Sequence, residues 1–154
     1  MKIAGYSALS KDAVYLLSRA EFEKQKVITT KYAVKVLGSY RKATSMLDNL
    51  SKRNRLIQLK RGQYIIVPLQ APNQLWMPND YVMAALWMDN IPYYIGYTSM
   101  YSYWGFTDQV QQSVTILNTG KEGKKNIKNI KYIAIKISPR KMYGTNKIKI
   151  EGQE

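Results

Sequence analysis

The 154-residue chain contains no cysteine and no histidine. Disulfides, thiol nucleophiles, zinc sites built on these ligands and imidazole acid–base catalysis are therefore excluded together. Long hydrophobic runs are also missing. The longest fully apolar run, Tyr81 to Met88, is eight residues, whereas a helix that spans a bilayer needs about 20. The N-terminus lacks the basic, apolar and small-residue order of a signal peptide, so we expect no leader.

Acidic side chains are scarce, and basic ones are unevenly distributed. Ten Asp and Glu face 24 Lys and Arg, a net charge of +14, which favours a polyanionic partner. Residues 1–70 carry fourteen basic and four acidic side chains, residues 71–120 carry three acids and no Lys or Arg, and residues 121–154 carry ten basic and three acidic side chains. The pattern predicts two basic units around an apolar, Trp- and Tyr-rich middle. Nucleic acid is the first partner to consider, and an anionic membrane is the second. A membrane-surface role needs a basic helix with a strongly apolar opposite face, and the first expected helix has too few basic residues for that, so we expect no membrane partner.

Catalytic patterns are absent as well. The three acids of the middle segment, Asp80, Asp89 and Asp108, show neither paired-acid nor metal-ligand spacing. The sequence therefore predicts no enzyme, no cofactor and no metal site.

The N-terminal third contains helix signals at close intervals. Ser10 can cap a helix through Arg19 or Ala20, and residues 27–28 suit a very short strand. Thr29 or Thr30 caps a second helix, which Gly38 ends in the position of a left-handed C-cap. Ser39 restarts a third helix at once, and its apolar stripe consists of Ala43, Met46, Leu47 and Leu50.

Beyond the third helix the hydrophobic period changes. Residues 56–60 and 63–68 suit two strands joined at Arg61-Gly62. The order helix, helix, tight turn, helix, hairpin is typical of a winged helix-turn-helix, predicted here over residues 1–69. In that arrangement the second helix of the pair enters the major groove. The alternative is a solvated surface helix without a partner.

The candidate DNA-binding residues are polar or basic side chains on the third helix, the connection that follows it and the hairpin tip. They are Ser39, Tyr40, Arg41, Lys42, Thr44, Ser45, Lys52, Arg53, Arg55, Lys60, Arg61 and Gly62. Arginine suits bidentate contacts with guanine and phosphate, and four of the six arginines lie within 21 residues of one another. Asp48 argues against a purely phosphate-facing helix, but it can pair with Lys52 four residues later.

The second half, residues 70–154, predicts a small α+β domain with a mostly antiparallel sheet. Residues 70–78 suit a linker, and helices are expected over residues 79/80–88 and 96–104. In the second of these helices an aromatic stripe recurs at helical spacing. We interpret it as core or domain interface, with a stacking platform for single-stranded nucleic acid as the alternative. The stripe consists of Tyr97, Met100, Tyr101 and Trp104.

Alternating residues predict strands over 113–117, 131–137 and 147–150. The lysine-rich segment 121–131 is expected to be an exposed loop. The whole chain is therefore predicted to belong to the α+β class.

Two segments resemble a known family. Residues 52–64 end in Arg61-Gly62-Gln63-Tyr64, which is similar to an "arginine-glycine-x-tyrosine" pattern in the wing. Residues 92–109 resemble the signature "tyrosine-isoleucine-x-x-x-serine-alanine-x-x-x-x-glycine-leucine-threonine-x-glutamine", with Met100 in place of alanine and Phe106 in place of leucine. The family is that of the AbiEi-like antitoxins and transcriptional regulators of abortive-infection AbiE-type toxin–antitoxin systems.

The resemblance implies a cytoplasmic prokaryotic repressor that binds double-stranded DNA in the operator of its own operon. It places Arg41, Lys42 and Arg61 where the family meets DNA, and it gives the C-terminal region an antitoxin role toward a nucleotidyltransferase toxin. Family members generally extend further, so this sequence is expected to be a short or C-terminally truncated variant. A homodimer stays open. The alternative function is a protein-interaction module that binds the toxin through residues 70–154, with DNA binding incidental.

Overall fold

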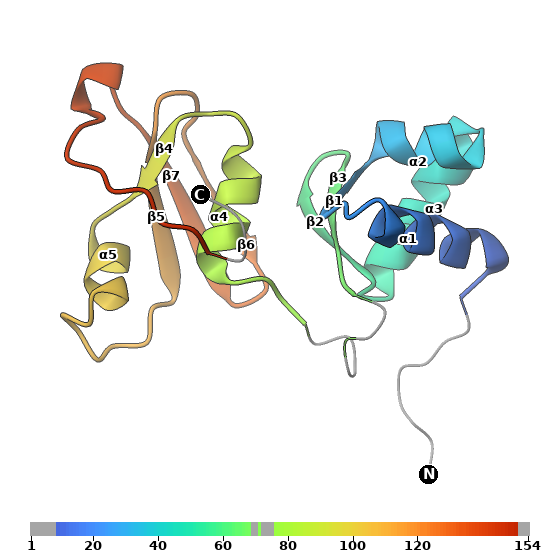
Figure 1. Ribbon diagram of the computed structural model, residues 1–154, viewed down its shortest axis with the longest axis horizontal. Helices are drawn as coiled ribbons and strands as arrows, with labels where there is room; N and C mark the ends of the chain where they lie inside the picture. Colours follow the sequence, from blue (N-terminus) through green and yellow to red (C-terminus); the bar gives the residue numbers. More distant parts are fainter. Residues whose placement is uncertain (1–8, 69–70, 72–75, 151–154) are drawn as a thin grey trace, which may run out of the picture. The chain divides into compact units, whose positions relative to one another are not determined.

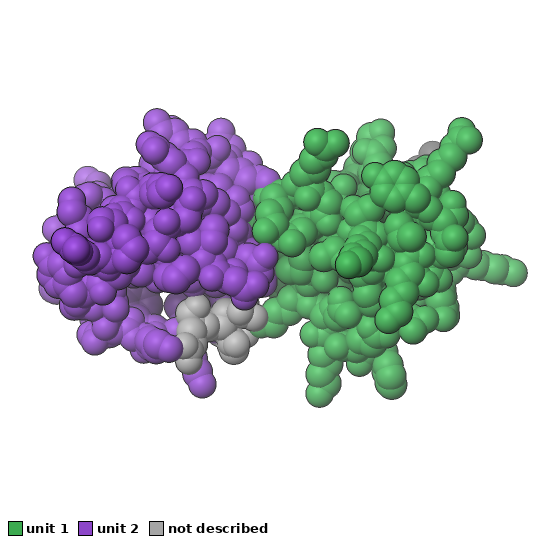
Figure 2. All heavy atoms as spheres, turned by 90° about the horizontal axis from the view of Figure 1, so that it is seen from above, with its two compact units in different colours: residues 1–77 green, residues 78–154 purple. Residues whose placement is uncertain are grey.

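The computed structural model describes residues 9–68, 71 and 76–150. The chain has the α+β composition expected from the sequence and divides into two compact units, residues 1–77 and 78–154 (Figure 1). Figure 2 shows the two units in different colours. The predicted boundary after residue 69 lies outside the described residues, and so does most of the predicted linker.

Unit 1, residues 1–77, contains the three expected helices. They are α1 (Lys11–Phe22), α2 (Thr30–Leu37) and α3 (Tyr40–Lys52). Each begins at a hydroxyl cap whose oxygen accepts an N–H three residues later, over 3.3 Å at Ser10, 3.1 Å at Thr29 and 3.5 Å at Ser39. Such caps satisfy backbone donors that the first turn leaves without intrahelical partners. The predicted starts are confirmed, and α1 runs slightly further than expected.

A three-stranded antiparallel sheet completes unit 1. Its strands are β1 (Val27–Thr29), β2 (Leu56–Lys60) and β3 (Gln63–Ile66), in the order β1-β3-β2. The hairpin of β2 and β3 confirms the predicted pair of strands. Its tip is held against the start of α2, because the Thr30 N–H donates to the Gly62 carbonyl over 2.9 Å.

The core of unit 1 joins the apolar faces of the helices to one face of the sheet (Figure 1). Full burial of one such large aliphatic side chain is worth about 1.5–3 kcal/mol. The buried set is Ala13, Leu16, Leu17, Ala20, Ile28, Ala33, Ala43, Leu47, Leu50, Leu56 and Ile66.

A polar contact also ties α1 to α2. Glu23, just after α1, accepts hydrogen bonds from Arg19 over 3.0 Å and from the Tyr32 hydroxyl over 2.9 Å. These bonds hold the pKa of the Glu23 carboxyl below its ordinary value, with the Arg19 bond as the larger cause.

Unit 2, residues 78–154, is a four-stranded sheet with two helices and a final helical turn. The elements are α4 (Asp80–Met88), β4 (Tyr93–Ile95), α5 (Thr98–Tyr103), β5 (Ser113–Asn118), β6 (Gly123–Ile127), β7 (Ile130–Lys136) and η2 (Pro139–Lys141). The strand order is β4-β5-β7-β6, in which only β5 and β7 run parallel. The sheet is thus mostly antiparallel, as predicted. None of the described helices is long and apolar enough to cross a bilayer.

Two predictions for the C-terminal region are wrong. The segment expected to be a basic loop contains β6, a strand that pairs only with β7 and keeps Lys124 exposed. An edge strand has one pairing neighbour, so its composition can stay polar. The segment 147–150, in contrast, forms only an isolated bridge at Ile150, and Ile148 is 36% exposed. Alternation does not produce a strand where no apolar face is buried.

The part of the interpretation that places the aromatic stripe in a core is wrong. Tyr97, Met100, Tyr101 and Trp104 are 59, 41, 49 and 54% exposed. The helix that carries two of them, α5, is short and rests on the sheet through its opposite face, where Ser99 is buried. Helical spacing identifies a shared face, but it does not tell whether a neighbour covers that face.

Candidate nucleic-acid interface

The position of α3 is fixed by a very short joint. Gly38 and Ser39 alone separate α2 from α3, and Gly38 has φ +73°, which closes α2 through a 2.8 Å hydrogen bond from its N–H to the Val34 carbonyl. Ser39 then caps the next helix. The joint leaves the first turn of α3 in solvent, with Ser39, Tyr40 and Arg41 exposed and Tyr40 at 69%.

One row of α3 side chains points directly outward. At about 3.6 residues per turn, Arg41, Ser45, Asp48 and Lys52 fall on one line, and all four are exposed. Asp48 and Lys52 form the expected ion pair, 2.7 Å from oxygen to nitrogen. Both side chains remain largely in solvent, so the pair adds little stability. Along this row Arg41 and Ser45 come first, and the neutralised pair Asp48–Lys52 follows toward the C-terminal end of α3.

Thr44 lies beside this row and uses its hydroxyl inside the helix. Its Oγ1 lies 3.0 Å from the Tyr40 carbonyl and 3.1 Å from the Arg41 carbonyl, as donor to either. The side chain is half-buried. Among the predicted contact residues of α3, Thr44 is thus the one whose proton is already engaged by the backbone.

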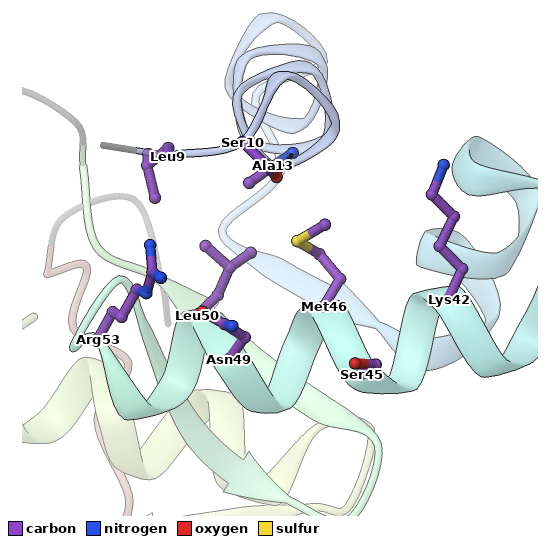
Figure 3. A pocket seen from close by; sticks show the side chains of 9 residues that line it. All are labelled: Leu9, Ser10, Ala13, Lys42, Ser45, Met46, Asn49, Leu50 and Arg53. Carbon is purple, nitrogen blue, oxygen red and sulfur yellow. Dashed lines mark hydrogen bonds between the residues drawn. The ribbon is translucent and has the colours of Figure 1, made fainter. Parts of the chain in front are cut away.

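A second row of α3 side chains faces a groove beside the N-terminus of α1 (Figure 3). Lys42 and Arg53 stand at opposite ends of this groove, which has a volume of about 330 Å³. The Lys42 ammonium also pairs with Asp12 of α1 over 2.8 Å. The lining is Leu9, Ser10, Ala13, Lys42, Ser45, Met46, Asn49, Leu50 and Arg53. Of the predicted residues, Arg41 and Lys52 belong to the outward row, Lys42 and Arg53 line the groove, and Ser45 does both. The sequence prediction did not name Asn49 or Ser10, which also line the groove, although Asn49 stands seven residues after Lys42.

Arg55 does not lie at the surface. It is 5% exposed and occupies the connection from α3 to β2. Its N–H donates to the Leu50 carbonyl over 2.9 Å, and its carbonyl accepts from the Val67 N–H over 3.0 Å. The prediction that Arg55 reaches DNA with its neighbours is wrong, because the chain turns inward there to place the buried Leu56.

The hairpin tip presents one exposed cation and one that is half-buried. Arg61 is exposed and Lys60 is half-buried. Gly62 adopts φ +75°, and a Cβ at this position would lie 3.2 Å from the Thr30 hydroxyl oxygen. The glycine thus permits both the turn and the close approach to α2.

The comparisons with known proteins bear on the fold. No protein-family model matches the sequence, and no curated protein matches it. Among solved structures, the chain is similar to the crystal structure of the Rv2827c protein from Mycobacterium tuberculosis, with a TM-score of 0.63 and 15% sequence identity. The match covers 90% of this chain and 50% of that one, so this chain spans about half the length of its structural neighbour. At this identity the similarity concerns the fold alone.

Proposed function

We propose that unit 1 is a winged helix-turn-helix domain and that the protein is a DNA-binding transcriptional repressor. In this proposal α3 is the recognition helix and the β2–β3 hairpin is the wing. The observation that carries the proposal is the exposed first turn of α3. A capped helix that begins two residues after its predecessor presents Tyr40, Arg41 and Ser45 to solvent. This is the part of a recognition helix that reads base edges.

The charge of unit 1 supports the proposal. Residues 1–77 carry fourteen basic and four acidic side chains, a net +10. A duplex is recognised first through its phosphates, and cations that replace condensed counterions supply most of that affinity. Arg41 at the helix start and Arg61 at the hairpin tip have the geometry for bidentate contacts. Arg53 and Lys60 add positive charge after α3 and at the hairpin, whereas Lys42 and Lys52 are paired with Asp12 and Asp48.

The biological role that we propose is the autoregulating antitoxin of a toxin–antitoxin pair, which acts on the operator of its own operon. This step rests on the resemblance of residues 52–64 and 92–109 to the AbiEi-like family. The alternative is binding of a nucleotidyltransferase toxin through residues 70–154 with DNA binding incidental.

The decisive measurement is the affinity for duplex DNA as a function of salt. Anisotropy titrations would use a labelled duplex from the region upstream of the protein's own gene and an unrelated duplex of equal length. We expect tighter binding to the first, and a log–log slope of about −0.9 per phosphate neutralised. A flat salt response, or no binding to either duplex at low salt, would contradict the proposal.

A matched pair of variants locates the surface. Arg41→Ala/Arg61→Ala should weaken binding at least tenfold and reduce the magnitude of the salt slope by up to about 2. Lys136→Ala/Arg140→Ala removes the same charge from exposed positions in unit 2 and should have a smaller effect. Equal losses in the two variants would show that net charge alone governs binding.

To test the alternative function, the Arg41/Arg61 variant should be co-purified with the product of the adjacent gene. Retained co-purification, together with equal affinity of the wild-type chain for the two duplexes, would favour that alternative.

A further inference from the structure

Unit 2 exposes six large apolar side chains on α5 and on the residues at either side of it, here called the α5 surface. Phe106 is 75% exposed and lies 6.4 Å from Tyr101 between ring centroids. Tyr103 and Trp104 are 5.3 Å apart in an edge-to-face arrangement. The six members are Tyr97, Met100, Tyr101, Tyr103, Trp104 and Phe106, with exposed fractions of 41 to 75%. Figure 1 shows the position of α5 in the unit.

The backbone at both ends of α5 adopts positive φ angles while the side chains of this surface stay in solvent. Tyr97, which precedes α5, has φ +54° and ψ −139°, a conformation that costs a non-glycine residue on the order of 1–3 kcal/mol. At the other end Gly105 has φ +71°, and the Phe106 N–H donates to the Tyr101 carbonyl over 2.8 Å. This return of the chain brings the Phe106 ring back against Tyr101. A strained entry and a left-handed exit thus hold large apolar side chains outward.

The area of the α5 surface is that of an interface. A buried aromatic side chain contributes about 150–250 Å², so the exposed fractions of the six side chains correspond to roughly 600 Å². The largest apolar patch on a typical monomer is about 300–600 Å² and is often functional. Two copies of this surface would bury roughly 1,200 Å², which is the lower limit for a stable specific interface.

The distribution of charge indicates which partner covers the α5 surface. The chain carries a net +14, so two copies repel each other over most of their surface. Residues 71–120, which include the whole α5 surface, contain no Lys or Arg. The side chains that form the α5 surface therefore add no cation of their own to a contact between two copies. We propose that the protein forms a homodimer through the α5 surfaces of two copies. This inference does not rest on the proposed DNA binding, because it concerns unit 2.

The test is the mass of the full chain as a function of its concentration. Sedimentation equilibrium at moderate salt should show reversible association from a monomer of 17.8 kDa to twice that mass. Trp104→Ser/Phe106→Ser should weaken the association at least tenfold. Phe22→Ser, which replaces an aromatic that is 88% exposed in unit 1, should leave it unchanged. Circular dichroism melts of the variants check that both remain folded.

Salt provides an independent readout. Higher salt screens the repulsion between two cationic chains, so dimerisation should become tighter as salt increases, whereas an interface of ion pairs would weaken. A chain that stays monomeric up to millimolar concentration would overturn the inference. A dimer that the Trp104/Phe106 variant does not weaken would also overturn it. Monomeric protein whose binding of single-stranded oligonucleotide is lost in that variant would assign the surface to base stacking instead.

Discussion

At the scale of single residues, Ser99 shows how a motif residue can serve the fold rather than a ligand. It is 1% exposed, and its Oγ accepts the Thr115 N–H over 3.0 Å and donates to the Ser113 carbonyl over 3.3 Å. The Tyr81 hydroxyl donates to the Ser99 carbonyl over 3.1 Å. Ser99 therefore connects α5 to both β5 and α4. The sequence identifies this serine as part of a signature, but only the hydrogen bonds show that it is an anchor.

Removal of the Ser99 hydroxyl is expected to lower the free energy of unfolding by a measurable amount. In Ser99→Ala the Thr115 N–H loses its buried acceptor, and an unsatisfied buried group of this kind costs about 1–3 kcal/mol. Urea denaturation followed by circular dichroism measures the free energy of unfolding. Ser138→Ala, an exposed serine without a capping hydrogen bond, is the control and should change it by less than about 0.5 kcal/mol. Equal effects of the two substitutions would refute the anchoring role.

The arginines show what residue type can and cannot predict. Arg41 and Arg61 are exposed as expected, whereas Arg55 is buried. The three arginines lie close together in the sequence, but closeness in the sequence does not tell in which direction each side chain points. The direction of each side chain is set by its element, which is the outward row of α3 for Arg41, the hairpin tip for Arg61, and the inward turn before β2 for Arg55.

At the scale of elements, the joint between α2 and α3 depends on one backbone conformation. A Cβ at Gly38 would meet no atom within 4 Å, so the cost of a side chain there arises from φ +73° alone. Gly38→Ala should lower the free energy of unfolding by about 1 kcal/mol. Gly38→Asn should lower it by less, since asparagine tolerates the left-handed region. Chemical denaturation measures the free energy of unfolding of both variants. Equal losses in the two would show that the cause is not the positive φ.

Local signals predict the elements of unit 1 well, and those of unit 2 less well. Hydroxyl caps, Gly38 and the Arg61-Gly62 turn act within a few residues, so they can be recognised in the sequence alone. The edge strand β6 and the segment 147–150 depend instead on which neighbours are available for pairing. The lysine-rich segment 123–127 forms a strand because β7 pairs with it along its length, whereas the alternating segment 147–150 makes only an isolated bridge at Ile150.

At the scale of the whole molecule, three charge segments become two units. The cation-free segment 71–120 and the lysine-rich segment 121–154 largely share unit 2, where β5 from the first pairs with β7 from the second. Residues 78–154 carry ten basic and six acidic side chains, a net +4 against +10 in residues 1–77. Composition predicts segments along the chain, but long-range strand pairing decides which segments fold together.

The two proposals together predict cooperative DNA binding. A symmetric dimer presents two reading helices, and its operator should contain two related half-sites. The wild-type chain should therefore bind a duplex with two half-sites more tightly than two independent sites allow, at a preferred spacing found by varying the distance between them. Trp104→Ser/Phe106→Ser should keep the affinity for one half-site and lose the cooperativity, because its substitutions lie in unit 2 while the proposed reading surface lies in unit 1. Footprinting titrations on one-site and two-site duplexes separate these quantities. If this variant lost affinity for the single half-site as well, the α5 surface would belong to the DNA interface, and the division of labour between the two units would be wrong.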